Sequence, residues 1–221
     1  MKKLFKSIRD NDIETVIQII QKKPELVNCI AKQPPKKDDG QSPLQVALKT
    51  GNFDIADFLI DMGSNLNFME DESCCNEWRM PVVHDAINAA VMCSRWNTNS
   101  KLIGFKVFST AEKAEKAYSV LKKMIYNGAN VNNVDSHGNS GLWRFCLQAN
   151  QVLPSYNYSK HCEGDNRIFT EELHKDLIRI LRLLKNAGAD PSYAANSFEK
   201  SPVDFYTDGS LSMILKEVFM N

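Results

Sequence analysis

The side chains of this sequence with the widest chemical repertoire are its histidines and cysteines, which can act as bases, nucleophiles or metal ligands. The segment from His161 to His174 places several such groups close together and could form a metal or acid–base site, but its spacing does not put them on one rigid face. The adjacent Cys74 and Cys75 lack the second pair of ligands that a zinc site needs. We expect no metal, no cofactor and no disulfide. The residues of these two types are His84, His137, His161, His174, Cys29, Cys74, Cys75, Cys93, Cys146 and Cys162.

Motifs that carry catalysis are also missing from the sequence. It contains no phosphate-binding glycine loop, no Gly-x-Ser-x-Gly turn and no His-Glu-x-x-His pair. The acidic segment around Asp71 and Glu72 lacks the alternating carboxylates of a calcium loop. These observations predict a protein that is not an enzyme.

The charge balance excludes two further classes of partner. Lys plus Arg and Asp plus Glu each number 27, so the formal net charge is zero. A neutral chain has no general positive field to hold a nucleic acid or an anionic membrane. Polar residues between Asp10 and Glu14 interrupt the sequence where a signal peptide would need its apolar core. No apolar run reaches the ~20 residues that span a bilayer. We expect a cytoplasmic protein, with delivery into a host cell left open.

The elements that would position these side chains repeat along the chain. Residues 58–67, 124–132 and 183–192 each read as an amphipathic helix that runs into a glycine and a short polar turn. Glycine suits the position after a helix because it adopts the left-handed conformation without steric cost. The openings repeat too, with Ser-Pro at Ser42 and again at Ser201. Units of this size must stack to complete a core.

The segment from Gly40 to Asn67 resembles the ankyrin repeat, whose signature is Thr-Pro-Leu-His-x-Ala followed by a glycine. Ser42-Pro-Leu-Gln-Val-Ala47 and Gly51 fall in register with it, and the diverged copies keep His84 or replace that histidine with Trp143. The resemblance implies an all-α solenoid of about five stacked repeats with short β-hairpin loops, in one domain over 1–221. It also implies a structural hydrogen bond for His84. The expected repeats are about 1–30, 37–69, 77–133, 135–192 and 196–221.

The third and fourth repeats are much longer than the period of ~33 residues. Their insertions, about 94–110 and 150–170, both fall between the two helices of a repeat. Stacking should therefore bring them side by side. They are rich in aromatic residues, including Trp96, Tyr156 and Tyr158, which could either pack against each other or form an exposed patch that binds a partner.

The resemblance implies a non-enzymatic module that binds another protein, as an inhibitor, immunity or adaptor protein, and that is monomeric alone. The alternative is an enzyme or small-ligand site built from the two insertions. Ankyrin repeats bind through a concave surface of hairpin tips and inner helices. Carried over by position, and joined by the insertion aromatics, the candidate binding residues are Asp38, Asp39, Gln41, Trp78, Met80, His137, Asn139, Phe198, Lys200, Trp96, Tyr156 and Tyr158.

Overall fold

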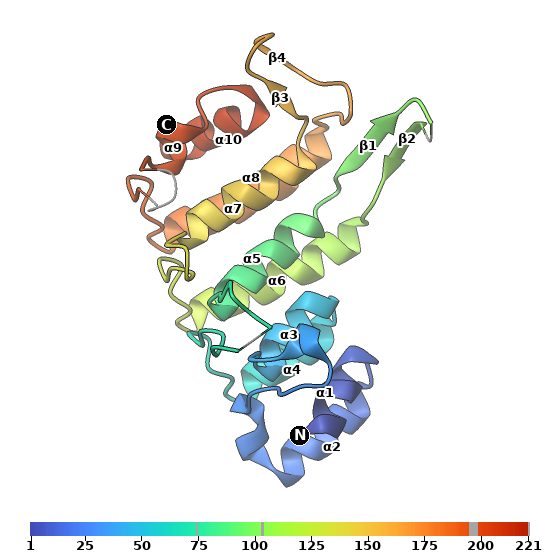
Figure 1. Cartoon of the computed structure of the whole chain (residues 1–221). Helices are drawn as coiled ribbons and strands as arrows, with labels where there is room; N and C mark the ends of the chain where they lie inside the picture. Colours follow the sequence, from blue (N-terminus) through green and yellow to red (C-terminus); the bar gives the residue numbers. More distant parts are fainter. Residues whose placement is uncertain (74, 103, 195–198, 221) are drawn as a thin grey trace.

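The computed structural model of the chain describes residues 1–73, 75–102, 104–194 and 199–220. Within them the chain is mostly helical, and consecutive helices pair and stack in a row (Figure 1). The helices are α1 Lys2–Arg9, α2 Ile13–Lys22, α3 Pro43–Thr50, α4 Phe53–Asp61, α5 Val82–Met92, α6 Ala111–Tyr126, α7 Gly141–Val152, α8 Glu171–Asn186, α9 Pro202–Phe205 and α10 Gly209–Phe219. The shorter elements are the 3-10 turns η1 Pro24–Asn28 and η2 Lys36–Asp38, and the strands β1 Asn97–Ser100, β2 Gly104–Val107, β3 Tyr156–Asn157 and β4 Cys162–Glu163.

A serine residue is the N-cap of the first helix in three of the helix pairs. The hydroxyl of Ser42 accepts a hydrogen bond from the Gln45 amide at 3.2 Å, and the Gln45 side chain accepts one from the Ser42 amide at 3.2 Å. Ser140 and Ser201 cap α7 and α9 with their side chains alone, which accept hydrogen bonds from the amides of Trp143 and Asp204. These contacts satisfy amides that have no partner within a helix. Gly51, with φ of 73°, then makes the sharp turn into α4.

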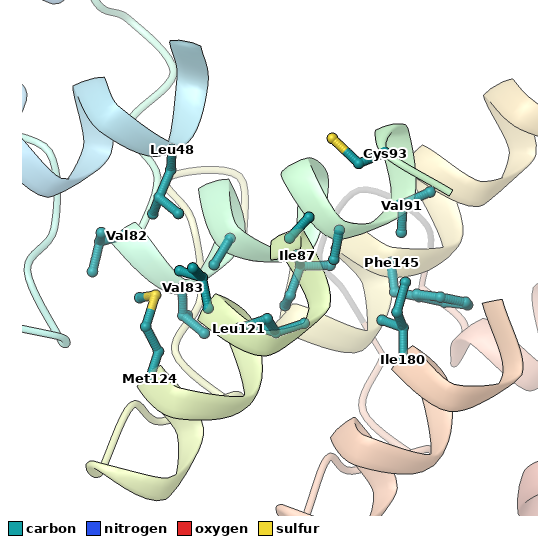
Figure 2. Packing of buried hydrophobic residues seen from close by; sticks show 14 of the residues in the cluster. Leu48, Val82, Val83, Ile87, Val91, Cys93, Leu121, Met124, Phe145 and Ile180 are labelled. Carbon is teal, nitrogen blue, oxygen red and sulfur yellow. The ribbon is translucent and has the colours of Figure 1, made fainter. Parts of the chain in front are cut away.

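The core is continuous along the row of helices. Leu48 of α3 and Ile87 of α5 are buried in it, as are Leu121 of α6, Phe145 of α7 and Ile180 of α8 (Figure 2). Each helix pair therefore covers the apolar face of its neighbour, which is the arrangement expected of units too small to bury their own face.

Three asparagines join consecutive connections between helix pairs in the same way. Each side-chain amide donates to a glycine carbonyl in the next connection, and its oxygen accepts from the backbone amide two residues later. All six hydrogen bonds are 2.7–3.1 Å long. The repeated geometry shows that these connections stack in register. Asn28 bonds Gly63 and Asn65, Asn67 bonds Gly128 and Asn130, and Asn132 bonds Gly188 and Asp190.

The two expected insertions form short β-hairpins at the side of the row opposite these connections (Figure 1). The first hairpin pairs β1 with β2, and the second pairs β3 with β4, both antiparallel. The Asn99 amide donates to the Asn166 carbonyl at 2.8 Å, and the Asn97 side chain bonds the backbone of Ile168 at 2.7 and 2.9 Å. The prediction that the insertions lie side by side is confirmed.

Candidate functional site

Trp78 is an exposed aromatic side chain that the surrounding structure holds in place. It lies in the connection between α4 and α5, and 43% of its surface is exposed. Its indole N–H donates to Asp135 Oδ2 at 2.9 Å, the guanidinium of Arg144 lies 4.8 Å from its ring centroid, and the ring of His137 meets it edge-on at 4.8 Å. An aromatic side chain ordered before binding loses little entropy when a partner covers it.

Asp135 organises this arrangement from a buried position. Its carboxylate accepts hydrogen bonds from the Arg144 guanidinium at 2.7 Å and from the amides of His137 and Asn139 at 2.9 Å. Burial raises the pKa of Asp135, but the hydrogen bonds from Asn139, Trp78 and Arg144 outweigh it and hold that pKa below its usual range. The carboxylate therefore stays ionised and fixes both Arg144 and the loop that carries His137.

Three of the residues expected on the binding surface are buried instead. Asp38 accepts a hydrogen bond from the guanidinium of Arg9, the Gln41 side chain donates to Glu70 at 2.9 Å, and the Asn139 side chain donates to Asp135 at 3.0 Å. Position in the repeat suggested loop tips, but these polar groups satisfy the interior of the loops. They are removed from the candidate surface.

The other loop residues divide by exposure. Trp78 and His137 are exposed, whereas Asp39 and Met80 are half-buried, and Asp39 accepts hydrogen bonds from Gln33 at 3.2 and 3.3 Å. Phe198 lies outside the described residues. Trp78 and His137 therefore form the centre of the candidate surface at these loops.

The structure brings three further predicted residues together at the end of the row. Tyr156, Tyr158 and Lys200 line an open groove of about 510 Å³ with Phe205 and Tyr206. The rings of Tyr156 and Tyr158 meet edge-on at 5.0 Å. Lys200, which was expected on the concave surface, thus lies beside the second insertion. The sequence did not predict this proximity.

Trp96 packs within the first insertion. Its ring stacks on Phe108 with centroids 4.4 Å apart, its N–H donates to the Met92 carbonyl at 3.0 Å, and the guanidinium of Arg167 lies 5.6 Å from its centroid. The salt bridge between Arg95 and Asp176, at 2.9 Å, ties the base of this insertion to α8. Trp96 is half-buried and Tyr158 is exposed, so one residue packs and the other faces solvent.

His84 and Asp85 are buried neighbours on α5 that hold the interior together. The His84 Nε2–H donates to the Asn133 carbonyl at 3.0 Å, which is the structural role expected of it. Burial lowers the pKa of His84 to about 4. Asp85 accepts from the Gln45 side chain at 2.9 Å, and burial raises its pKa to about 6.

These two shifts predict opposite responses to acid. Because unfolded His84 binds a proton more readily, its contribution to stability is lost as the pH falls from 6.5 to about 4. Folded Asp85 binds a proton more readily, so its contribution rises as the pH falls from about 6 to 3.8. Each pKa shift changes the free energy of unfolding by about 3 kcal/mol across its window. We expect acidification to lower the stability of Asp85→Asn more steeply than that of the natural chain. We expect it to raise the stability of His84→Gln relative to the natural chain. Denaturant unfolding across this window measures the slopes, and equal slopes in all three proteins would contradict the prediction.

Among the described residues no group of three or more His, Cys, Asp or Glu side chains could hold a metal ion. Cys29, Cys93, Cys146 and Cys162 are free thiols, while Cys74 lies outside the described residues. Within the same described part of the chain, no helix combines the length and the apolar character needed to cross a membrane.

The stacked helix pairs and the glycine turns together fit a helical repeat fold. Residues 39–71, which include α3 and α4, match the family model described as Ankyrin repeat. The match shows an ankyrin repeat over this segment and supports an ankyrin-repeat family for the chain. Proteins of this family generally mediate protein–protein interaction. No curated protein matches the sequence.

Sequence reasoning missed two groups of residues, one that holds Trp78 in place and one that is exposed on the first insertion. Asp135 and Arg144 hold Trp78 although they are far from it in sequence, so no local pattern could pair them. Leu102 and Val107 stand exposed on the first insertion. Their exposure depends on the hairpin register, which the sequence did not fix.

Proposed function

We propose that this chain is a non-enzymatic module that binds one specific protein through the surface centred on Trp78 and His137. The observation that carries the proposal is that Trp78 is exposed and yet fixed by Asp135, Arg144 and His137. Tryptophan and arginine are the residues that most often dominate binding energy at protein interfaces. An inhibitor, immunity or adaptor role would follow from binding alone.

We propose further that the module is a cytoplasmic, monomeric solenoid of five ankyrin repeats, formed by the helix pairs α1–α2, α3–α4, α5–α6, α7–α8 and α9–α10. The recurring asparagine bonds support this arrangement for the first four pairs. The contacts of α10 with α7 and α8 support it for the fifth. The groove at Tyr156, Tyr158 and Lys200 would extend the binding surface to the end of the row.

The test is recovery of a partner from native lysate by the full chain and by Trp78→Ala. We expect the natural chain to retain one protein that Trp78→Ala loses, with a fall in affinity of roughly 30-fold or more, since such a residue contributes about 2 kcal/mol or more. The variant should stay folded with only a modest fall in melting temperature, because 43% of the side chain is exposed and Asp135 keeps its hydrogen bonds from Arg144 and Asn139.

The matched control is Tyr126→Ala. Tyr126 is also a large aromatic residue, 73% exposed, but it lies on the outer helix α6. This variant should retain the partner. Equal retention by both variants, or equal loss, would show that the surface centred on Trp78 is not the binding site.

A further inference from the structure

The first insertion presents a strand edge whose backbone groups point into solvent. In an antiparallel pair, residues alternate between those that bond the partner strand and those that point away from it. The Phe108 amide donates to the Trp96 carbonyl at 2.9 Å, so in this register Phe105 and Val107 point their N–H and C=O groups away from β1. All four residues of β2 are exposed.

The other edge of the same hairpin is already used for strand-like contact. The Asn99 amide points away from β2 and donates to the Asn166 carbonyl of the second insertion at 2.8 Å. The second insertion therefore anchors β1, while β2 forms the outer edge of this small sheet. An open edge of this kind is a template for one more strand.

The side chains of the first insertion indicate which strand would fit. Phe105 and Val107, on one face of β2, are 52% and 43% exposed, and Leu102 at the tip is 93% exposed. Lys106 lies on the opposite face, with its ammonium 5.4 Å from the Phe108 centroid. Within the described residues, neither Lys106 nor Lys101 forms an ion pair with a carboxylate.

We infer that the outer edge of β2 binds an extended segment of a partner protein in which an acidic residue is flanked by apolar ones. The backbone of Phe105 and Val107 would continue the ladder, and their side chains would pack against the two apolar residues. The acidic residue would lie opposite Lys106, where opposite charges stabilise the pairing.

The same charge argues against a second copy of this chain as the occupant. The antiparallel register that pairs Phe105 of each copy with Val107 of the other places Lys106 directly opposite itself. Like charges in that position are destabilising. The edge therefore suits a strand of complementary charge.

The experiment is a titration of the isotope-labelled full chain, followed through its backbone amide NMR signals, with the capped peptide Ser-Val-Glu-Val-Ser. We expect the signals of residues 104–108 to shift to saturation at millimolar peptide. The matched peptide with lysine in place of glutamate should bind roughly three- to tenfold more weakly, and Lys106→Glu should reverse this preference. N-methylation of the peptide backbone at the bonding positions should abolish the shifts.

A backbone variant separates ladder formation from charge attraction. Val107→Pro removes one amide from the edge and should abolish binding, whereas Val107→Thr keeps the amide and should retain it. Unchanged helix signals would show that both variants fold. Absence of shifts at residues 104–108 with either peptide would overturn the inference and leave Lys106 as a guard against edge aggregation. Self-association of the natural chain through this edge would also overturn it.

The outcome is independent of the surface centred on Trp78, with which this inference shares only the premise that the chain binds protein. Trp78→Ala should leave peptide binding at β2 unchanged. Failure of the peptide titration would leave the proposed function standing, and loss of the lysate partner in Trp78→Ala would leave the strand edge standing. The two proposals can therefore fail separately.

Discussion

Deletion of residues 211–221 should unfold or aggregate the chain, and it is the largest effect that we expect. The deleted part of α10 carries four buried apolar side chains, and the helix contacts α8 and α7. Burying each such side chain contributes about 1.5–3 kcal/mol, whereas a whole domain is stable by only about 5–15 kcal/mol. The exposed face of α8 would then be open to association. The four are Leu211, Ile214, Leu215 and Val218.

The deletion should also disturb the second insertion. The Ser210 amide donates to the Glu163 carboxylate of β4 at 2.5 Å, and without the rest of α10 this amide would no longer be held in place. The deletion also removes the hydrogen bond of Glu217 with His174 at 2.8 Å and its ion pair with Arg182 at 3.0 Å, both of which join α10 to α8. Thermal unfolding followed together with light scattering measures the loss of stability and the aggregation. A deletion variant that melts as the natural chain does would show that this segment is a dispensable tail.

Point variants give a milder version of the same test. Ile214→Ala should lower the unfolding free energy by about 2–5 kcal/mol because the side chain is fully buried. The neighbouring Met213 is 51% exposed, so Met213→Ala should change it by less than about 0.5 kcal/mol. Equal effects at the two positions would show that α10 does not pack as described.

Removal of the carboxylate in Asp135→Ala should lower the unfolding free energy by about 3–5 kcal/mol. The substitution leaves Arg144 as a buried charge without its partner and removes the acceptor of the Trp78 indole N–H. Because the folded pKa of Asp135 is lowered, its contribution is fully present at neutral pH and is lost as the pH falls through the folded value. Binding through Trp78 should weaken as well, since its ring would no longer be fixed.

A double variant distinguishes an ion pair from a general packing defect. Asp135→Ala combined with Arg144→Met should lose less stability than the sum of the two single variants, because no charge is then left alone in the interior. The control is Asp10→Ala, which removes an exposed pair with Lys6 at 3.9 Å and should cost less than about 1 kcal/mol. Strict additivity at Asp135 and Arg144 would contradict the proposed coupling.

The sequence alone determined the local structure and much of the family. Ser42, Pro43 and Gly51 predicted where α3 begins and ends, because capping and left-handed turns depend on residues a few positions apart. The two insertions were likewise placed side by side from repeat length, since stacked units keep their insertions in register. Such features can be predicted from the sequence because they depend only on neighbouring or regularly spaced residues.

Only the tertiary structure decided which polar and aromatic side chains face solvent. Gln41 and Trp78 lie at equivalent loops, yet Gln41 is buried on Glu70 and Trp78 is exposed over Arg144. Position in a repeat does not distinguish them, because each outcome depends on a partner tens of residues away. The free edge of β2 was hidden for a related reason. A shift of one residue in the register would turn Phe105 and Val107 to the other face, and only the folded hairpin fixes that register.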